Sequence, residues 1–244
     1  MTAAQPNADQ PNADQPRADA PHVDQTHVDQ THGRRSDAPS PEDARCTVGR
    51  GPTGSYAVVA VASSAGGVQG LSTLLGALGP ELPVPVLVVQ HLDPRHRTVI
   101  ADVLDRRTDL PVELAEAGRK PTPGTVHIAP PGRHLLIGAD GDLTLSDAEL
   151  VHFVRPSADL LFESVAAYYG PRAIACVLTG TGVDGAMGVE AVHARGGTVI
   201  VEDPRTAEFS GMPQAALNTG VVDFVLPLVE IAAVVRGLLD ATGQ

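Results

Sequence analysis

The chain has 244 residues, of which 43% are hydrophobic, and it carries a formal net charge of −12. An acidic chain lacks the basic face with which nucleic-acid-binding proteins release counterions, so we expect no nucleic-acid partner. Two cysteines support neither a disulfide framework nor a metal cluster. With no secretory signal and no apolar stretch of membrane-spanning length, the sequence predicts a cytoplasmic protein without membrane insertion.

The first 52 residues differ in composition from the rest of the chain. A five-residue unit, Gln-Pro-Asn-Ala-Asp, begins at Gln5 and again at Gln10, and looser copies continue to His32. A segment with so few large aliphatic residues cannot bury enough surface to offset its ordering entropy. Histidines and aspartates in it could bind a transition metal, but a solvated low-complexity tail is favoured. We predict a disordered tail over residues 1–52, dispensable for catalysis, and one folded domain over residues 53–241.

From Tyr56 onward, short apolar runs alternate with helix-like patterns. In chain order the predicted elements are strand 57–62, helix 68–78, strand 84–89, helix 96–107, strands 112–115, 125–129, 134–137 and 142–145, helix 157–168, strand 173–178, helix 185–194, strand 198–201, helix 213–217, strand 221–225 and helix 228–239. This alternation predicts an α/β fold with a doubly wound, mainly parallel, Rossmann-like sheet. Proline and glycine around residues 120–147 predict a small β-rich excursion with a hairpin turn at Asp140-Gly141, and Ser157 is a candidate N-cap.

Reactive side chains follow three of the predicted strands. Ser63 and Ser64 precede a glycine pair after the first strand, His91 follows the second, and Asp184 lies in a glycine-rich loop after strand 173–178. Because the carboxyl ends of parallel strands open on one edge of a sheet, these groups could meet as a nucleophilic triad. A serine at such a turn could equally hold a phosphate at the helix N-terminus, and the residue types leave both serines open.

The glycine-rich loop has a second interpretation. Gly180-Thr-Gly182-Val-Asp-Gly185 fits G-x-G-x-x-G after a strand, and acidic Glu202-Asp203 end the next strand, as in a dinucleotide site. Against this, Asp184 would place a carboxylate where a pyrophosphate must bind, and little chain remains for the rest of such a domain. We therefore expect no cofactor, and the folded domain shows no metal-ligand spacing.

Six motifs in series resemble the catalytic domain of CheB-type chemotaxis-receptor methylesterases, over residues 56–239. They are Val-Ala-Val-Ala-Ser-Ser-Ala-Gly-Gly from Val59, Val-Val-Gln-His-Leu from Val88, Ile-Ala-Pro-Pro-Gly-Arg-His from Ile128, Arg-Pro-Ser-Ala-Asp from Arg155, Val-Leu-Thr-Gly-Thr-Gly-Val-Asp-Gly-Ala from Val177 and Gly-Met-Pro from Gly211. The resemblance implies a protein-glutamate methylesterase whose substrate and partner is a methylated chemoreceptor-like signalling protein. Many members of that family also deamidate glutamines.

The resemblance also implies roles for individual residues. It makes Ser64 the nucleophile, His91 the base and Asp184 the residue that orients the histidine, while the backbone N–H groups of Ala65 and Thr181 hold the oxyanion. Regulated members carry a phospho-receiver domain, for which residues 1–52 are too short, so we expect a stand-alone catalytic domain not switched by phosphorylation in cis.

The sequence departs from the family pattern at the nucleophile and in the aspartate loop. Ala62-Ser63 replaces the usual Gly-Ala, and Thr181 replaces the usual methionine. These changes keep two alternatives open: an adaptor that binds methylated or amidated helices without turnover, and a hydrolase of an unrelated ester. For other residues we expect a surface position for His96, packing near the pocket for Met212, a structural role for Arg155, and either loop structure or substrate contacts for Arg133 and His134.

Overall fold

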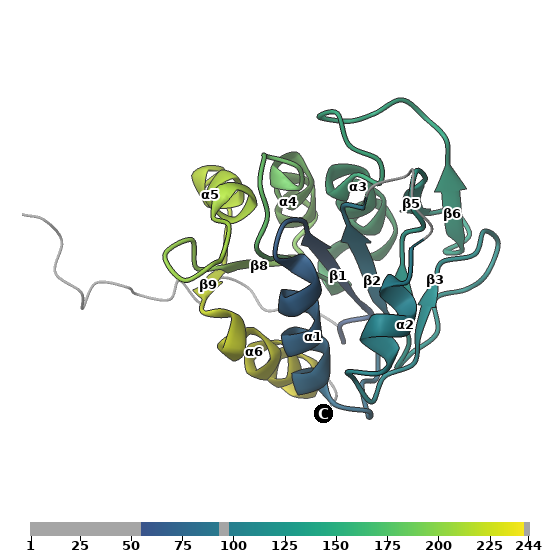
Figure 1. Ribbon diagram of the computed structural model, residues 1–244, viewed down its shortest axis with the longest axis horizontal. Helices are drawn as coiled ribbons and strands as arrows, with labels where there is room; N and C mark the ends of the chain where they lie inside the picture. The colour runs from purple at the N-terminus through teal and green to yellow at the C-terminus, as the bar shows by residue number, and fades with distance from the viewer. Residues whose placement is uncertain (1–54, 93–97, 242–244) are drawn as a thin grey trace, which may run out of the picture. The chain divides into compact units, whose positions relative to one another are not determined.

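The computed structural model describes residues 55–92 and 98–241, so the predicted tail and the expectation for His96 lie outside the described residues. Its centre is a seven-stranded sheet in the order β3-β4-β2-β1-β7-β8-β9 (Figure 1). All six neighbouring pairs run parallel. The strands are β1 Val58–Ser63, β2 Val86–Gln90, β3 Val112–Leu114, β4 Val126–Ile128, β7 Ala173–Val177, β8 Thr198–Glu202 and β9 Phe224–Leu226.

Helices cover both faces of this sheet, which explains why the central strands are continuous apolar runs. Every residue of β1, β2 and β7 is buried, as is typical of parallel sheets covered on two sides. One core packs α1 Gly67–Leu78, α2 Ile100–Asp105 and α6 Leu228–Ala241 against the sheet. The other packs α3 Ala158–Tyr169, α4 Ala186–Ala194 and α5 Gly211–Asn218 on the opposite face (Figure 1). The predicted doubly wound α/β fold is therefore confirmed.

The β-rich excursion divides into two parts. Its first strand, β4, joins the main sheet between β2 and β3, and only β5 His134–Ile137 and β6 Leu143–Ser146 form a separate antiparallel hairpin. The expected turn at Asp140-Gly141 lies in this hairpin, where Gly141 adopts a φ of 75°. The predicted last strand, residues 221–225, is displaced, because the structure begins β9 only at Phe224.

The strand order places two loops side by side at the carboxyl edge. On one side of β1 the sheet continues through β2, β4 and β3, and on the other side β7, which comes later in the chain, pairs with β1. The loops after β1 and β7 therefore flank the point where the order reverses, which is where open α/β sheets bind ligands. Ser64 follows β1 and Asp184 follows β7, so the topology brings two of the predicted site residues to this point. None of the described helices is long and apolar enough to cross a bilayer.

Candidate active site

The two serines after β1 have different environments. Ser63 is completely buried, and its hydroxyl donates a hydrogen bond of 2.7 Å to Gln90 Oε1. Ser64 is partly exposed, and within the described residues its hydroxyl has no hydrogen-bond partner. Its backbone is nevertheless fixed, because its N–H donates to Thr179 O and its carbonyl accepts from Gly67 N. Of the two hydroxyls, that of Ser64 is the one free to meet a substrate.

Gln90 links the turn after β1, which carries Ser64, to His91. Its Nε2 donates to the carbonyl of Ser64 at 2.8 Å and to the carbonyl of His91 at 3.0 Å. The Ser63 hydroxyl occupies the amide oxygen of Gln90, and this fixes the amide orientation that points Nε2 at both carbonyls. The pairing of Ser63 with Gln90 in the β1–β2 ladder places the following residues, Ser64 and His91, on adjacent strand ends.

Gln90 and Ser63 pack so closely against Gly67, the first residue of α1, that no side chain fits at this position. A Cβ at this position would lie 2.0 Å from Gln90 Oε1 and 2.8 Å from Ser63 Oγ. We expect Gly67→Ala to displace the Gln90 amide, to lower the free energy of unfolding by about 1–3 kcal/mol, and to lower turnover as well. Urea denaturation and a rate assay measure the two effects.

The matched control is Gly237→Ala in α6, where an added Cβ meets nothing within 4 Å. Because alanine favours a helix over glycine, this variant should gain about 0.5–1 kcal/mol of stability at unchanged turnover. Equal stability of the two variants would contradict the packing explanation.

His91 and Asp184 form a hydrogen-bonded pair. His91 Nε2 lies 2.8 Å from Asp184 Oδ2, and the two side chains are 13% and 3% exposed. A carboxylate that accepts from Nε2 fixes the tautomer with the proton on Nε2, which leaves Nδ1 as the basic nitrogen. Within the described residues Nδ1 has no hydrogen-bond partner, so it is available to accept a proton.

The N-terminus of α3 holds the Asp184 carboxylate. Ser157 Oγ donates to Asp184 Oδ1 at 2.7 Å, Ala158 N to Oδ2 at 2.6 Å, and Asp159 N to Oδ1 at 3.2 Å. Ser157 thus occupies the predicted N-cap position, but its hydroxyl binds Asp184 and makes no capping bond to its own helix. Burial alone would raise the pKa of Asp184, but the hydrogen bonds from His91, Ala158, Ser157 and Asp159 outweigh it and hold that pKa below its ordinary value.

Asp159 performs the reciprocal task at α4. Its Oδ1 accepts from Gly185 N at 2.9 Å and from Gly188 N at 2.8 Å, and burial raises its pKa with help from the nearby charge of Asp184. Each carboxylate therefore binds the N-terminus of the other's helix. The N–H groups of Gly185 and Gly188, which a pyrophosphate would need, already donate to the Asp159 carboxylate. This argues against the dinucleotide interpretation of the glycine-rich loop.

The two predicted oxyanion groups lie in the loops after β1 and β7, with Ala65 in the first loop and Thr181 in the second. Ala65 is partly exposed and Thr181 is exposed, and in the described part of the chain neither backbone N–H has a hydrogen-bond partner. The loop that carries Thr181 is fixed by its neighbours, since Gly180 N donates to Phe209 O and Met212 N donates to Gly180 O. A fixed loop with an unpaired N–H is suited to binding an oxyanion.

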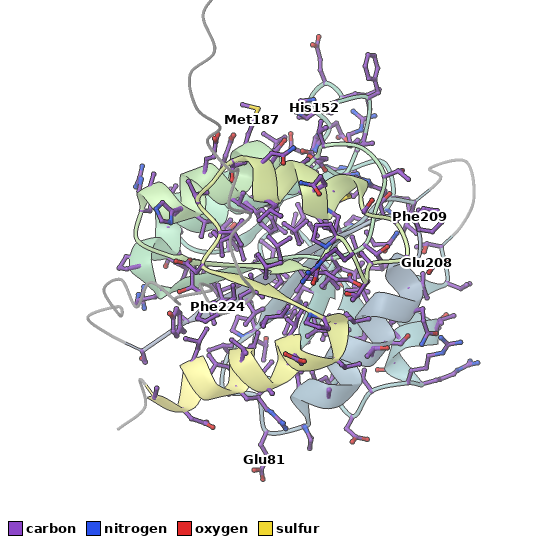
Figure 2. The ribbon with its side chains drawn as sticks, turned by 90° about the vertical axis from the view of Figure 1, so that its left-hand side faces the viewer. Glu81, His152, Met187, Glu208, Phe209 and Phe224 are labelled. Atoms are coloured by element: carbon purple, nitrogen blue, oxygen red, sulfur yellow. The ribbon has the colours of Figure 1, made fainter. Side chains whose placement is uncertain are left out.

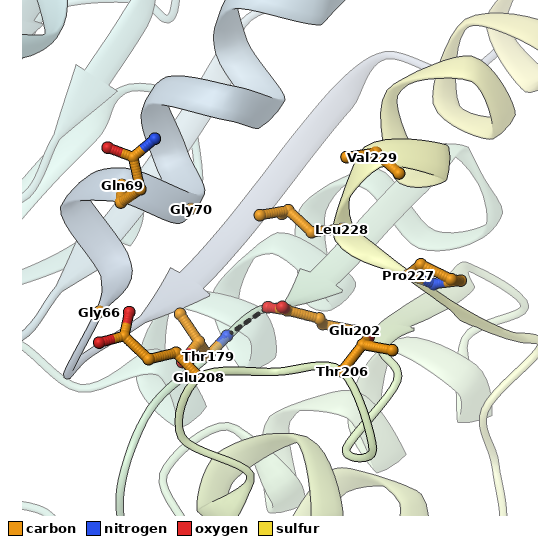
Figure 3. Close-up of a pocket in the computed structure, with 10 residues that line it drawn as sticks. All are labelled: Gly66, Gln69, Gly70, Thr179, Glu202, Thr206, Glu208, Pro227, Leu228 and Val229. Carbon is orange, nitrogen blue, oxygen red and sulfur yellow. Dashed lines mark hydrogen bonds between the residues drawn. The ribbon is translucent and has the colours of Figure 1, made fainter.

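Two cavities lie near these loops. One, of about 230 Å³, is lined by His91, Leu92, Gly132, Leu150, Phe153, Val154 and Arg155. The other, of about 280 Å³, adjoins the turn after β1 and is lined in part by Gly66, Glu202 and Glu208 (Figure 3). In it, buried Glu202 Oε2 accepts from Thr179 N at 2.7 Å, and Thr179 Oγ1 donates to Ala65 O. Through Thr179, Glu202 therefore supports the turn after β1. Burial and the charge of Glu208 raise the pKa of Glu202, although the hydrogen bond from Thr179 N lowers it.

The other residues for which we drew an expectation from the sequence make contacts within the fold. His134 is fully buried between Glu149 O and Ser157 N, and Arg133 binds Leu145 O and the carboxylate of Asp147. The Arg155 guanidinium donates to the carbonyls of Asp147 and Ala148. Met212 is buried against Gly180, where a Cβ would lie 2.4 Å from its sulfur. Among the described residues, no three His, Cys, Asp or Glu side chains gather as metal ligands would.

Sequence reasoning missed the roles of three residues, which are Gln90, Ser157 and Asp159. Gln90 was detectable as a polar residue ending an otherwise apolar strand. Ser157 and Asp159 have the types expected in any helix N-terminus, so the sequence gives no sign that they serve another loop.

Comparison with known proteins identifies the family of this chain. The model of the family described as CheB methylesterase matches residues 59–235. A putative protein-glutamate methylesterase/protein-glutamine glutaminase of Leptospira interrogans is 36% identical over 72% of this chain and 92% of its own length. The corresponding protein of Moorella thermoacetica is 39% identical, but this chain spans only 45% of its length.

A solved structure gives the same result for the fold. The CheB methylesterase catalytic domain of Thermotoga maritima superimposes with a TM-score of 0.71 at 36% identity, over 77% of this chain and 99% of that domain. The resemblance seen in the six motifs is thus confirmed in sequence and in three dimensions. The chain belongs to the CheB methylesterase family, among proteins named protein-glutamate methylesterases.

Proposed function

We propose that this protein is a serine esterase that removes methyl esters from glutamate side chains of chemoreceptor-like signalling proteins. The observation that carries the proposal is the His91–Asp184 pair, in which Asp184 is buried and held by the N-terminus of α3. It lies at the strand ends where the Ser64 hydroxyl has no hydrogen-bond partner among the described residues. A base oriented by a third group beside a hydroxyl is the arrangement that nucleophilic hydrolysis requires.

In the first half-reaction, Ser64 Oγ attacks the ester carbonyl carbon while His91 Nδ1 takes the hydroxyl proton. The negative charge moves to the carbonyl oxygen, where the N–H groups of Ala65 and Thr181 stabilise it. Asp184 stabilises the imidazolium that forms. When the tetrahedral intermediate collapses, the C–O bond to the methoxy group breaks, His91 returns the proton, and methanol leaves.

In the second half-reaction, water attacks the acyl-enzyme and His91 accepts its proton. Collapse of this intermediate breaks the bond to Ser64 Oγ, which regains the proton, and a glutamate carboxylic acid is released. A glutamine side chain can follow the same path with ammonia as the leaving group, which extends the proposal to deamidation. The steps use the three side chains of Ser64, His91 and Asp184, the two backbone N–H groups and water.

The test measures methanol released from a receptor cytoplasmic domain whose glutamates carry isotope-labelled methyl esters. A serine-directed phosphonate is then expected to inactivate the protein and to label the peptide that contains Ser64. Binding of the methylated domain without methanol release would instead favour the adaptor alternative. Hydrolysis of simple esters with none of the methylated domain would favour a different ester as substrate.

A further inference from the structure

The segment between β6 and α3 presents two large apolar side chains to solvent. Phe153 is 96% exposed and Leu150 is 56% exposed, and we call these two residues the apolar tip. Single exposed apolar residues are ordinary on protein surfaces and need no explanation. These two, however, line the same cavity as His91, so an occupant of that cavity that touches the base also passes the apolar tip.

The backbone within this segment has an unusual conformation next to and at Phe153. His152 and Phe153 have φ values of 49° and 66°, in the left-handed region that side chains with a Cβ rarely adopt. Such conformations persist when the surroundings hold them, and they gather at binding and catalytic sites. Figure 2 shows His152 at the margin of the molecule, so core packing does not explain the conformation.

Several contacts hold the tip in place. Val151 and Val154 exchange two backbone hydrogen bonds around the strained pair. His152 Nε2 lies 3.3 Å from Asp159 Oδ2, the atom of that carboxylate which does not bind α4. At the base of the loop, Arg155 binds the carbonyls of Asp147 and Ala148, and His134 binds that of Glu149. A segment held from both sides yet exposing a phenylalanine is preorganised for contact with a partner.

We propose that the apolar tip docks an apolar side chain of the protein segment that carries the methylated glutamate. The proposal rests on the proposed function, because it takes the His91 cavity as the place where the ester binds. Because His91 and both residues of the apolar tip line the same cavity, we take its occupant to be the substrate itself. A protein segment that brings an ester to His91 contacts Leu150 and Phe153 with its neighbouring residues, and burying them contributes affinity that a short ester cannot gain.

Phe153→Gly tests the proposal because it removes the aromatic ring. Glycine also suits the positive φ at this position, so the melting temperature of the variant should not fall. The ratio of kcat/KM for a methylated receptor domain to kcat/KM for a short glutamyl methyl ester peptide should fall about ten-fold, mainly through KM for the domain. Phe153→Leu should restore most of this ratio. The control is Val225→Ser on β9, which replaces an exposed apolar residue that lines neither of the two cavities and should leave the ratio unchanged.

A binding measurement separates docking from turnover. Titration of the methylated domain into the S64A variant should give a Kd about ten-fold lower than titration into the S64A/F153G variant. Equal Kd values would overturn the docking proposal, whatever the rate of methanol release. An equal loss of kcat/KM for both substrates would overturn it too, since the loop would then support His91. Absence of methanol release from the parent, with the Kd difference intact, would overturn the proposed function and leave the docking surface in place.

Discussion

Replacing Ser64 with alanine is expected to lower kcat for ester hydrolysis by about 10⁵-fold, because the variant lacks the atom that forms the acyl-enzyme. The remaining rate should come from the proposed oxyanion groups, the N–H groups of Ala65 and Thr181, which can still polarise the ester for attack by water. Single-turnover methanol release measures the loss. The fold should be unaffected, since the Ser64 hydroxyl makes no hydrogen bond within the described residues.

Ser63→Ala is the matched control for this experiment. It removes a buried hydroxyl from the neighbouring residue and with it one of the bonds that orient the Gln90 amide, but the two bonds from Gln90 Nε2 to the carbonyls of Ser64 and His91 can still form. We expect a fall in kcat of less than about ten-fold, together with a stability loss of about 1 kcal/mol from the unmade hydrogen bond. If Ser63→Ala were the more damaging substitution in single-turnover assays, Ser64 would not be the nucleophile.

Replacing Asp184 with asparagine is expected to lower kcat by about 10⁴-fold, because an amide can donate to Nε2 of His91 and stabilise the wrong tautomer. The change should also lower the free energy of unfolding by about 1–3 kcal/mol, since a neutral amide replaces the charge that accepts from the N-terminus of α3. Turnover assays and urea denaturation at neutral pH measure the two effects.

The control for this variant is Asp159→Asn, which changes the adjacent buried carboxylate. Its Oδ1 can go on accepting from Gly185 and Gly188, and burial already disfavours the charge of Asp159. We therefore expect a much smaller loss of stability and of kcat than for Asp184→Asn. Similar effects of the two changes would mean that Asp184 acts through general packing of the loop and has no special relation to His91.

The depressed pKa of Asp184 gives the stability effect a pH dependence. A carboxyl group whose pKa is lower in the folded than in the unfolded state stabilises the fold above the unfolded value and loses this contribution as pH falls through the folded value. The stability difference between the parent and Asp184→Asn should therefore be fully present at neutral pH and shrink below the ordinary pKa of 3.8. A difference that grew on acidification would contradict the assigned direction.

The fold was largely predictable because its signals are local. The apolar runs that became β1, β2 and β7 and the glycine-marked turns after them are visible within a few residues. The topology rules for parallel strands then place Ser64, His91 and Asp184 on one edge. The membership of β4 in the main sheet was not predictable in this way, because a three-residue strand carries no pattern that names its partner.

The second layer of the site was not predictable, for a physical reason. Gln90, Ser157 and Asp159 act on loops 26 or more residues away in sequence, and hydrogen bonds leave no periodic trace in the chain. The resemblance named the three reactive groups and the two oxyanion N–H groups. The residue types alone left both serines open. The geometry adds that the Ser63 hydroxyl is hydrogen-bonded to Gln90, while that of Ser64 has no partner among the described residues, and it gives His134 a structural role.

The exchange of carboxylates between α3 and α4 links the chemistry of this protein to its local unfolding. Asp184 binds the N-terminus of α3, and Asp159 binds the N-terminus of α4. The two helices also approach closely at Gly188, where a Cβ would lie 2.6 Å from Phe162 Cβ. An opening that released either helix start would break bonds at both, so the pair should open and close as one cooperative unit. Because His91 takes its orientation from that unit, the fraction of molecules competent for catalysis cannot exceed the fraction in which these two helices are closed.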